Sequence, residues 1–252
     1  MAATIQSLER GLQILDILGK SGKPLSLNEL AEHFTIDRSS VFRLVSTLLK
    51  CGYVVQDDST KQYSLSYKVL ELSSVFTRQS NIEGLIRPII DEVIQETNQN
   101  THLAVLDGDQ VVFLMVEHPK DHLALNISIG LREPAMVTAL GKSLLAYQNS
   151  EILDRMLSSH VFVKYTDKSA TSSSQIRKSL ARVKKDLFAM DDEEYRPGIM
   201  CIAAPVFNNK SEVQFSIGIS GLKEVIKPNL KAYQKAVRDA GIKASKFLGY
   251  NH

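Results

Sequence analysis

Hydrophobic residues recur at helical spacing along the first fifty residues of the chain. The first series is Ile5, Leu8, Leu12, Leu15 and Leu18, and the last is Val41, Leu44, Val45, Leu48 and Leu49. Between them, Ser26 and Glu29 have the spacing of a capping box, and Asp37 is a favourable N-cap. The pattern predicts three helices, the last two joined by the short turn of a helix-turn-helix.

The outward face of the third predicted helix is polar and carries no acidic residue. Its residues are Arg38, Ser39, Phe42, Arg43, Ser46 and Thr47. Arginine and hydroxyl side chains suit phosphates and base edges, whereas a solvated helix usually mixes charges of both signs. The face therefore favours DNA binding. The alternative is an ordinary helical domain with a wet polar surface.

Strand-like alternation follows this helix. Residues 53–56 and 62–65 flank the polar turn 57–61, which predicts a hairpin. Helix, helix and hairpin in this order make the winged form of the motif. Lys61 lies near the tip of the wing, where it can touch the DNA backbone or the minor groove.

Helical spacing returns in residues 67–80, which predicts a connecting helix, and residues 81–84 interrupt it. A further helix is expected over 85–97, with Pro88 in its first turn, where proline is tolerated. We place the domain boundary near residue 80. The predicted division is a winged helix-turn-helix domain over 1–66, a linker helix over 67–80, and a second domain over 81–252.

The second domain mixes strands and helices. Two hairpins are predicted, one from residues 102–106 and 111–117 and the other from residues 200–207 and 213–220. Residues 123–127 are a further candidate strand, and a loop with Gly130 and Pro134 follows. Helical patterns cover 138–146, 151–157, 174–187 and 229–248. Two strand pairs on either side of a helical middle predict one antiparallel sheet with flanking helices, which is an α+β fold.

Composition limits the partners. No apolar run approaches the ~18 residues of a membrane span, and no signal-peptide pattern begins the chain, so we expect a cytoplasmic protein without a membrane partner. The net charge of the 252 residues is only +2, which argues against a nonspecific polyanion binder. DNA affinity would come from local placement of Arg38, Arg43 and Lys50, present twice in a dimer.

Enzyme and metal readings have weaker support. Cys201 could be a nucleophile with His102, His118 or His122 as its base, but free cysteines on apolar strands usually pack. The acidic run 191–194 reads as a solvated turn rather than a metal site. Pro119 breaks the helix that would align the two histidines beside it, so a polar loop is expected there. Cys51 and Cys201 match no zinc spacing, and no phosphate-binding glycine loop is present. We expect no catalytic residue, metal or cofactor.

Six segments together resemble the IclR (isocitrate lyase regulator) family of transcriptional regulators over nearly the whole chain. They are Ser7-Leu-Glu-Arg-Gly-Leu12, Arg38-Ser-Ser-Val-Phe-Arg-Leu44, Thr138-Ala-Leu-Gly-Lys142, Asp191-Asp-Glu-Glu-Tyr195, Gly198-Ile-Met-Cys-Ile-Ala-Ala-Pro-Val206 and Ser216-Ile-Gly-Ile-Ser-Gly221. The resemblance implies a winged helix-turn-helix, a linker helix and a GAF-like effector-binding domain. It also implies homodimers or homotetramers on paired half-sites of double-stranded promoter DNA. The effector would be an organic acid, a sugar acid or an aromatic catabolite, and the regulator a repressor or an activator.

For DNA contact, we expect the outward face of the recognition helix and the wing to be used. The candidate residues are Arg38, Ser39, Ser40, Phe42, Arg43, Ser46, Thr47 and Lys61. Ser39 and Ser40 lie in the first turn, where hydroxyls and free amides can hold a phosphate. Arg43 suits a base edge or a phosphate equally well. Phe42 replaces a more usual polar residue, and it either touches a thymine methyl group or folds back onto the preceding helix.

For the effector, the resemblance points to a cavity between the sheet and the helix over 138–145. The candidate residues are Ala139, Leu140, Gly141, Asp191, Ile199, Cys201, Gly218 and Ser220. The first three offer backbone amides to an anion. The Asp191 carboxylate favours a ligand with hydroxyl or N–H groups, and an anionic ligand would require it to be protonated or bridged by water. Gly218 replaces a serine and Glu133 an apolar residue of some relatives, so we expect a larger pocket with a more polar rim. The competing hypothesis is a ligand-binding module or enzyme whose helix-turn-helix mediates protein contacts.

Overall fold

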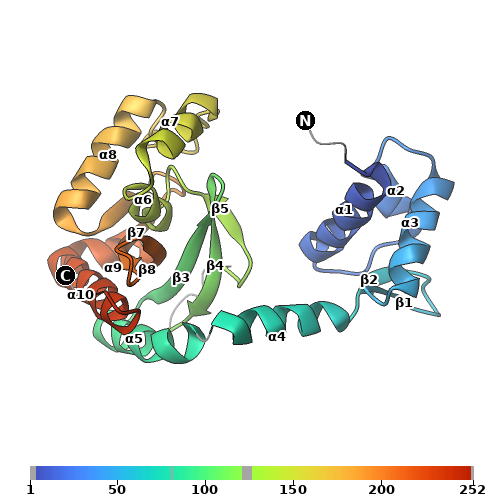
Figure 1. Cartoon of the computed structure of the whole chain (residues 1–252), viewed down its shortest axis with the longest axis horizontal. Helices are drawn as coiled ribbons and strands as arrows, with labels where there is room; N and C mark the ends of the chain where they lie inside the picture. Colours follow the sequence, from blue (N-terminus) through green and yellow to red (C-terminus); the bar gives the residue numbers. More distant parts are fainter. Residues whose placement is uncertain (1–3, 81, 121–126, 251–252) are drawn as a thin grey trace. The chain divides into compact units, whose positions relative to one another are not determined.

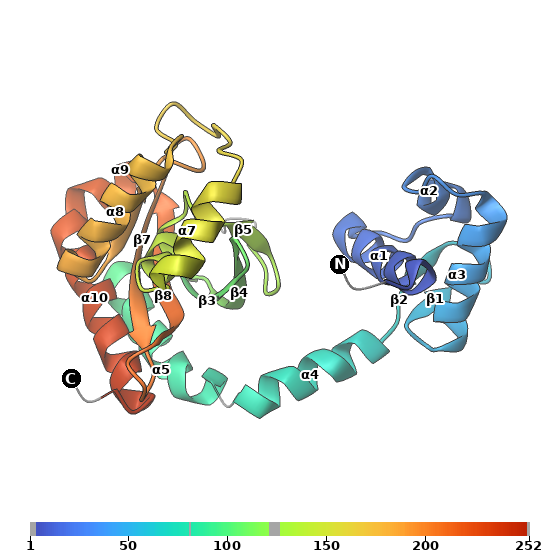
Figure 2. The same cartoon turned by 45° about the horizontal axis from the view of Figure 1, so that its top comes forward.

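The chain folds into two compact units, Met1–Asn81 and Ile82–His252. The computed structural model describes residues 4–80, 82–120 and 127–250. The first unit consists of helices with one small hairpin, and the second is built on a single large sheet, as Figures 1 and 2 show. Each unit has hydrophobic cores of its own.

The N-terminal unit is the predicted winged helix-turn-helix. Its first elements are α1 (Gln6–Ser21), α2 (Leu27–Glu32), α3 (Arg38–Lys50), β1 (Val54–Gln56) and β2 (Tyr63–Leu65). The capping box at α2 is complete: the Glu29 amide donates to Ser26 Oγ (3.3 Å) and the Ser26 amide to the Glu29 carboxylate (2.7 Å). The core residues are Ile14, Leu18, Leu25, Leu30, Val41, Val45, Val54 and Tyr63. They fasten α3 to α1 and to the hairpin.

The wing is a two-stranded antiparallel sheet in which Val54 pairs with Leu65. Its turn is organised by Asp57, whose carboxylate accepts hydrogen bonds from the amides of Ser59 (3.0 Å) and Thr60 (2.7 Å). Lys61 follows with a φ of +57° and an exposed side chain. The wing therefore presents a lysine at the end of an internally bonded turn.

Two helices follow the wing, α4 (Lys68–Ser80) and α5 (Ile82–Thr97). The prediction for the second was wrong at its start, because α5 begins three residues earlier than Leu85 and Pro88 lies inside it. Proline has no N–H to donate to the carbonyl four residues back, which is that of Gly84. The helix persists through this position because its face of Ile86, Ile89, Ile90 and Val93 is buried in the core; the first two of these bracket Pro88.

The second unit contains a six-stranded antiparallel sheet with strand order β5-β4-β3-β8-β7-β6. The strands are β3 (Asn100–Asp107), β4 (Gln110–Glu117), β5 (Arg132–Pro134), β6 (Ala189–Asp192), β7 (Ile199–Phe207) and β8 (Val213–Leu222). The helices are α6 (Ala139–Leu145), α7 (Ser150–Ser159), α8 (Ser173–Asp186), α9 (Lys223–Ile226) and α10 (Leu230–Phe247), with the 3₁₀ turn η1 (Lys227–Asn229) before α10. The α+β class is confirmed.

Helices cover both faces of this sheet. One core joins α5 and α10 to the sheet and includes Ile86, Val237 and Ile217. The other joins α6, α7 and α8 to the opposite face and includes Leu144, Leu157 and Leu180. Figures 1 and 2 show the two groups of helices on opposite sides of the strands. The second face, which carries the short helix α6, also contains the cavity described below.

Both edge strands depart from the predictions. Arg132–Pro134, expected in a loop, forms β5. Proline has no N–H to donate to a neighbouring strand, so it is tolerated in an edge strand. A solvated turn was expected over residues 191–194, but Asp191 and Asp192 belong to β6, and Ala189 and Asp191 are buried on one of its faces. Of the candidate strand 123–127, residues 123–126 lie outside the described residues. No helix in the described ranges has the length and apolar character that crossing a membrane requires.

Candidate nucleic-acid interface and ligand cavity

Helix α3 presents a polar face to solvent. Val41 and Val45 are buried on its inner side. On the outer side Arg38, Ser39, Phe42, Arg43 and Thr47 are exposed, and Ser40 and Ser46 are partly exposed. No acidic residue lies within the helix. Each predicted contact residue of α3 is thus accessible, and Lys61 is exposed on the wing.

The start of α3 is occupied by its own cap. The Asp37 carboxylate accepts hydrogen bonds from the Ser40 amide (2.9 Å), the Ser39 hydroxyl (2.5 Å) and the Ser40 hydroxyl (2.8 Å). These hydrogen bonds hold the pKa of Asp37 well below its usual value, and the bond from the Ser39 hydroxyl has the largest effect. The carboxylate is therefore ionised. In this structure these hydroxyls and the Ser40 amide donate to Asp37, and their contact with a phosphate stays a prediction.

Phe42 does not fold back onto the core. Its side chain is 50% exposed, and it is absent from the described residues that pack against the core of this unit. Arg43 is one position further along the exposed face, with Nη2 3.4 Å from Ser40 Oγ. An aromatic ring and a guanidinium are thus both exposed on consecutive residues of α3.

A narrow cavity of about 470 Å³, its mouth included, opens between the sheet and α6. Its wall consists of His102, Phe113, Ile127, Glu133, Thr138, Ala139, Leu140, Asp191, Tyr195, Arg196, Ile199, Cys201, Ile202, Ile219 and Ser220. Six of the predicted effector residues are in this wall, namely Ala139, Leu140, Asp191, Ile199, Cys201 and Ser220. Gly141 and Gly218 are not.

The two glycines serve close packing instead. A Cβ on Gly141 would lie 2.2 Å from the Ala135 backbone, so α6 can approach that segment only without a side chain here. A Cβ on Gly218 would lie 2.7 Å from the Ile202 carbonyl oxygen. The predictions that Gly141 binds the effector and that Gly218 enlarges the pocket are therefore not supported, because backbone atoms fill the space beside both residues.

The start of α6 keeps part of its predicted role. Thr138 is the N-cap, and its Oγ1 accepts a hydrogen bond from the Gly141 amide (3.3 Å) while donating to the Pro134 carbonyl (2.9 Å). The Gly141 amide is therefore engaged. The amides of Ala139 and Leu140 belong to the first turn, where no intrahelical acceptor exists, and both residues line the cavity.

Asp191 is the most perturbed acid of the cavity. It is 2% exposed, and its carboxylate accepts from the amides of Glu194 (2.6 Å) and Tyr195 (3.4 Å). Burial raises its pKa to about 7, although the nearby Lys142 and these hydrogen bonds act in the opposite direction. The prediction of a solvated turn was wrong for this residue. Near neutral pH Asp191 exchanges between its acid and its carboxylate form.

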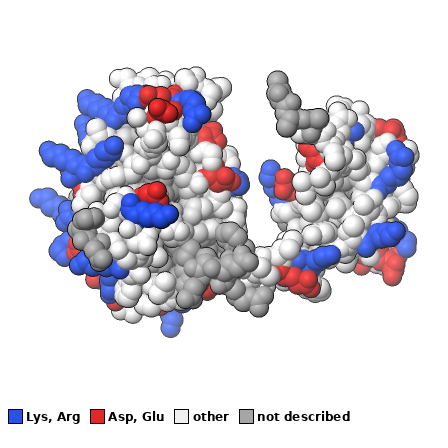
Figure 3. All heavy atoms as spheres, viewed as in Figure 1, with Lys and Arg blue, Asp and Glu red and all other residues white. Residues whose placement is uncertain are grey.

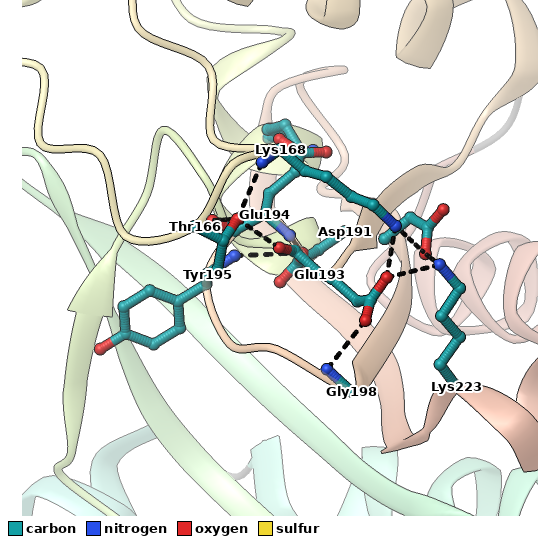
Figure 4. A network of polar contacts seen from close by, with 10 residues as sticks. Thr166, Lys168, Asp191, Glu193, Glu194, Tyr195, Gly198 and Lys223 are labelled. Atoms are coloured by element: carbon teal, nitrogen blue, oxygen red, sulfur yellow. Dashed lines mark hydrogen bonds and ion pairs between the residues drawn. The ribbon is translucent and has the colours of Figure 1, made fainter.

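The segment after β6 is held on several sides, as Figure 4 shows. Glu193, with a φ of +64°, pairs with Lys168 and with Lys223 (2.6 Å), and its carboxylate accepts from the Gly198 amide (3.0 Å). The Thr166 hydroxyl donates to the Glu193 carbonyl (2.6 Å). These contacts fix the chain that carries the cavity residues next to it.

A buried lysine braces the same segment from the other side. Lys142 of α6 is 1% exposed, and its Nζ contacts the Glu194 carboxylate. A fully buried ammonium is tolerated only with such a partner. The pair ties α6 to the end of β6, and therefore ties two walls of the cavity together.

His102 is a cavity residue that sequence reasoning considered only as a base for Cys201. Its Nε2 lies 2.7 Å from Ser220 Oγ, its ring packs edge-on against Phe113, and its Nδ1 has no hydrogen-bond partner among the described residues. Burial, and secondarily His118, lower its pKa to about 3, so the ring is neutral. Strand alternation places His102 on the face of Asn100 and Ala104, a signal that was available in the sequence.

An ion pair lies at another part of the wall. The buried Glu133 carboxylate is 2.9 Å from Arg196 Nη2. Burial raises the pKa of Glu133, and Arg196 partly opposes this. A polar contribution from Glu133 was expected. Its partner Arg196 was missed, because the two residues are 63 positions apart and no local pattern joins them.

Cys201 lacks the environment of a nucleophile. Burial, with Asp191 and Glu133 nearby, raises the pKa of its thiol well above the usual value, whereas a nucleophilic cysteine needs a lowered one. His102 is engaged with Ser220, His118 Nδ1 lies 2.6 Å from Asn100 Oδ1, and His122 is outside the described residues. Within the described ranges, no three His, Cys, Asp or Glu side chains gather as a metal site would require.

Comparisons with known proteins agree along the chain. Residues 7–58 match the IclR helix-turn-helix domain, and residues 75–246 match the C-terminal domain of the bacterial transcriptional regulator IclR. The HTH-type transcriptional regulator XynR of Escherichia coli K12 is 29% identical over 247 residues, which cover 98% of each chain.

Solved structures have the same fold. The IclR protein of Thermotoga maritima superposes with a TM-score of 0.78 at 24% identity, covering 98% of this chain and 100% of that one. An IclR homologue of Microbacterium hydrocarbonoxydans, solved with 4-hydroxybenzoate, has a TM-score of 0.84 at 17% identity and covers 96% of this chain and 98% of that one.

Both family domains occur in order, and the relatives that match nearly end to end are transcriptional regulators rather than enzymes. The chain belongs to the IclR family of bacterial transcriptional regulators, proteins with a DNA-binding helix-turn-helix and a C-terminal ligand-binding domain.

Proposed function

We propose that this chain is an effector-responsive regulator in which α3 reads promoter DNA and the cavity beside α6 binds a small acid. The observation that carries the proposal is the accessible, acid-free face of α3 in a unit separate from the unit that contains the cavity. A ligand controls such a protein by binding one arrangement more tightly than another, and a tenfold preference corresponds to about 1.4 kcal/mol.

In the DNA complex, α3 lies in the major groove. Arg43 contacts a base edge or a phosphate, and Arg38, Ser46 and Thr47 contact the flanking groups. Ser39 and Ser40 help to hold Asp37 and thus orient the first turn. Lys61 of the wing reaches the backbone or the minor groove. The exposure of all these side chains supports the assignment.

Replacing Arg43 with alanine should weaken binding to a duplex selected from random sequence by the wild-type protein. The expected loss is about 1–3 kcal/mol, or roughly 5- to 150-fold in Kd. Fluorescence anisotropy at several salt concentrations distinguishes a phosphate contact of Arg43 from a base contact. Loss of a phosphate contact lowers the slope of log affinity against log salt concentration by about 1, whereas loss of a base contact relaxes the sequence preference. Lys20→Ala, at the exposed end of α1, is the control. Equal binding by Arg43→Ala would reject the recognition-helix assignment.

Two copies of the chain are needed for a half-site pair, and the N-terminal unit offers apolar surface for the contact. On α1 the exposed residues are Ile5, Leu8 and Leu12, and on α4 they are Leu70, Leu72 and Val75. Apolar side chains exposed to water at helical spacing are unfavourable in a monomer and mark an interaction surface. We assign this surface to a homodimer, and a tetramer would need a further contact.

Leu12→Glu should shift the protein toward monomers. A charge placed in an apolar contact must be desolvated, so the dimer dissociation constant should rise by at least about tenfold. Light scattering across a concentration series measures this. Gln13→Glu adds the same charge at an exposed neighbouring position and should leave the mass unchanged. A wild-type monomer, or a Leu12→Glu protein that stays a dimer, contradicts the assignment.

The cavity combines apolar walls with a few polar groups. Phe113, Ile127 and Ile199 suit a compact or aromatic body. The Ala139 and Leu140 amides and Arg196 suit a carboxylate, and Asp191 and Ser220 suit a hydroxyl group. We therefore propose a small organic acid, a sugar acid or an aromatic catabolite. The structurally similar protein solved with 4-hydroxybenzoate supports the last of these.

Filling the cavity should abolish effector binding. A thermal-shift screen of organic, sugar and hydroxybenzoic acids should find ligands that raise Tm by about 2–8 °C at saturating concentration. Ile199→Phe should remove that shift. Its cross-strand neighbour Leu222 is exposed and outside the cavity wall, so Leu222→Phe is the matched control and should retain the shift. A ligand that stabilises both variants equally binds elsewhere.

Binding of a ligand that is fully anionic between pH 6 and 8 should weaken as pH rises. Asp191 is protonated below its pKa of about 7 and becomes a repelling carboxylate above it, so affinity should fall by about tenfold across this interval. Asp191→Asn cannot ionise and should flatten the profile in isothermal titration calorimetry. Asp91→Asn, exposed on α5, should behave as wild type. An unchanged pH profile in Asp191→Asn would remove Asp191 from the site.

A further inference from the structure

A second, larger groove of about 740 Å³, open space included, runs along the edge of the sheet on the outer side of β6. It lies between α8 and α10, which Figures 1 and 2 show near each other at one end of the sheet. Its lining consists of Ser179, Arg182, Val183, Asp186, Phe188, Ala189, Met190, Glu194 and Gln234. None of these residues lines the cavity described above, so the groove is a distinct site.

The surroundings of the groove hold an unusual share of the positive charge. Helix α8 and the segment from Lys227 to Phe247 together contain eleven Lys or Arg and two Asp, a net charge of +9. The net charge of the whole chain is +2, so the rest of the chain carries −7. Lys and Arg gather over α8 and α10 at the left of Figure 3, with few acidic residues between them.

Five of these basic residues flank the groove. On α8, Lys178 and Lys185 stand four and three positions from the lining residue Arg182, and therefore on its face of the helix. On α10, Lys231 and Arg238 stand three and four positions from the lining residue Gln234. None of the five forms an ion pair with a described residue, whereas Arg177, Lys235 and Lys243 on the same helices pair with Asp154, Asp239 and Glu92.

We propose that this groove binds an extended, acidic segment of a partner protein with an apolar side chain at its centre. The rim of Lys178, Arg182, Lys185, Lys231 and Arg238 complements the acidic residues of such a segment. Phe188 and Met190, which are partly exposed in the lining, accept its apolar side chain. β6 is an edge strand, bonded to β7 alone, so its outer edge has no neighbouring strand among the described residues.

The groove is better matched to a peptide than to nucleic acid. Asp186 and Glu194 belong to the lining, and a phosphodiester has no donor to offer them. A peptide does, through its backbone N–H groups. An apolar wall likewise has no counterpart in a duplex backbone. This proposal does not rest on the DNA and effector sites proposed above.

The test uses the full-length protein and an array of fluorescein-labelled hexapeptides in which aspartates and glutamates flank one variable residue. Peptides with Phe, Leu or Met at that position should bind best, and raising salt from 50 to 300 mM should weaken binding. The double variant Arg182→Glu, Lys231→Glu should weaken the best peptide by at least about tenfold.

The matched control is Arg177→Glu, Lys243→Glu, which makes the same charge change on the same two helices away from the groove. It should retain binding within about twofold. Circular dichroism and Tm verify that both variants are folded. The two variants should bind operator DNA as wild type does, and Arg43→Ala should bind the peptide as wild type does, so that this proposal and the DNA assignment fail separately.

Three results would overturn the proposal. One is that no acidic hexapeptide binds at 1 mM. Another is equal peptide affinity in the two charge variants. The third is that a 12-base-pair duplex of unrelated sequence, but no peptide, loses affinity in Arg182→Glu, Lys231→Glu, which would make the surface a nucleic-acid contact.

Discussion

The ion pair between Lys142 and Glu194 is the contact on which the architecture of the C-terminal unit depends. The ammonium is buried beneath α6, and Glu194 is the first residue after β6 whose side chain reaches it. Removing one member of a buried pair typically costs about 3–5 kcal/mol, because the other charge is left without compensation. The pair also constrains the geometry, because α6 and the segment after β6 cannot separate without leaving a charged group exposed or without its partner. The pair therefore holds α6 and this segment together, and the Glu193 contacts with Lys168 and Lys223 restrict the same segment from outside.

Much of the fold followed from local patterns in the sequence. The capping box at Ser26, the buried stripe of α3 and the hairpins of the large sheet are short-range features, and the structure contains them where they were expected. The edge strands were harder to predict. β5 has three residues, one of them proline, and β6 has aspartates at two of its four positions, so neither shows the alternation that identifies a strand. Pro88 was misplaced for a related reason, since tertiary burial on either side of it overrides the local cost of proline.

The candidate cavity was only partly accessible to sequence reasoning. Asp191, Cys201 and Ser220 were named because family resemblance pointed to them, and they are in the wall. His102, Phe113 and Arg196 were missed as cavity-lining residues, since their place depends on contacts between strands and loops far apart in sequence. Gly141 and Gly218 were misjudged in the opposite direction. A glycine at a matched position suggests room for a ligand, but here backbone atoms of neighbouring residues fill the space beside each glycine.

The four residues of β6 have a consequence of their own. Asp191 lines the cavity, while Ala189 and Met190 line the basic groove, so one strand of four residues contributes to both surfaces. A displacement of this strand alters both at once. By thermodynamic reciprocity, any factor by which a molecule in the cavity changes affinity at the groove must equal the factor by which an occupant of the groove changes affinity at the cavity. A regulator built this way would report metabolite level and partner availability as one combined quantity.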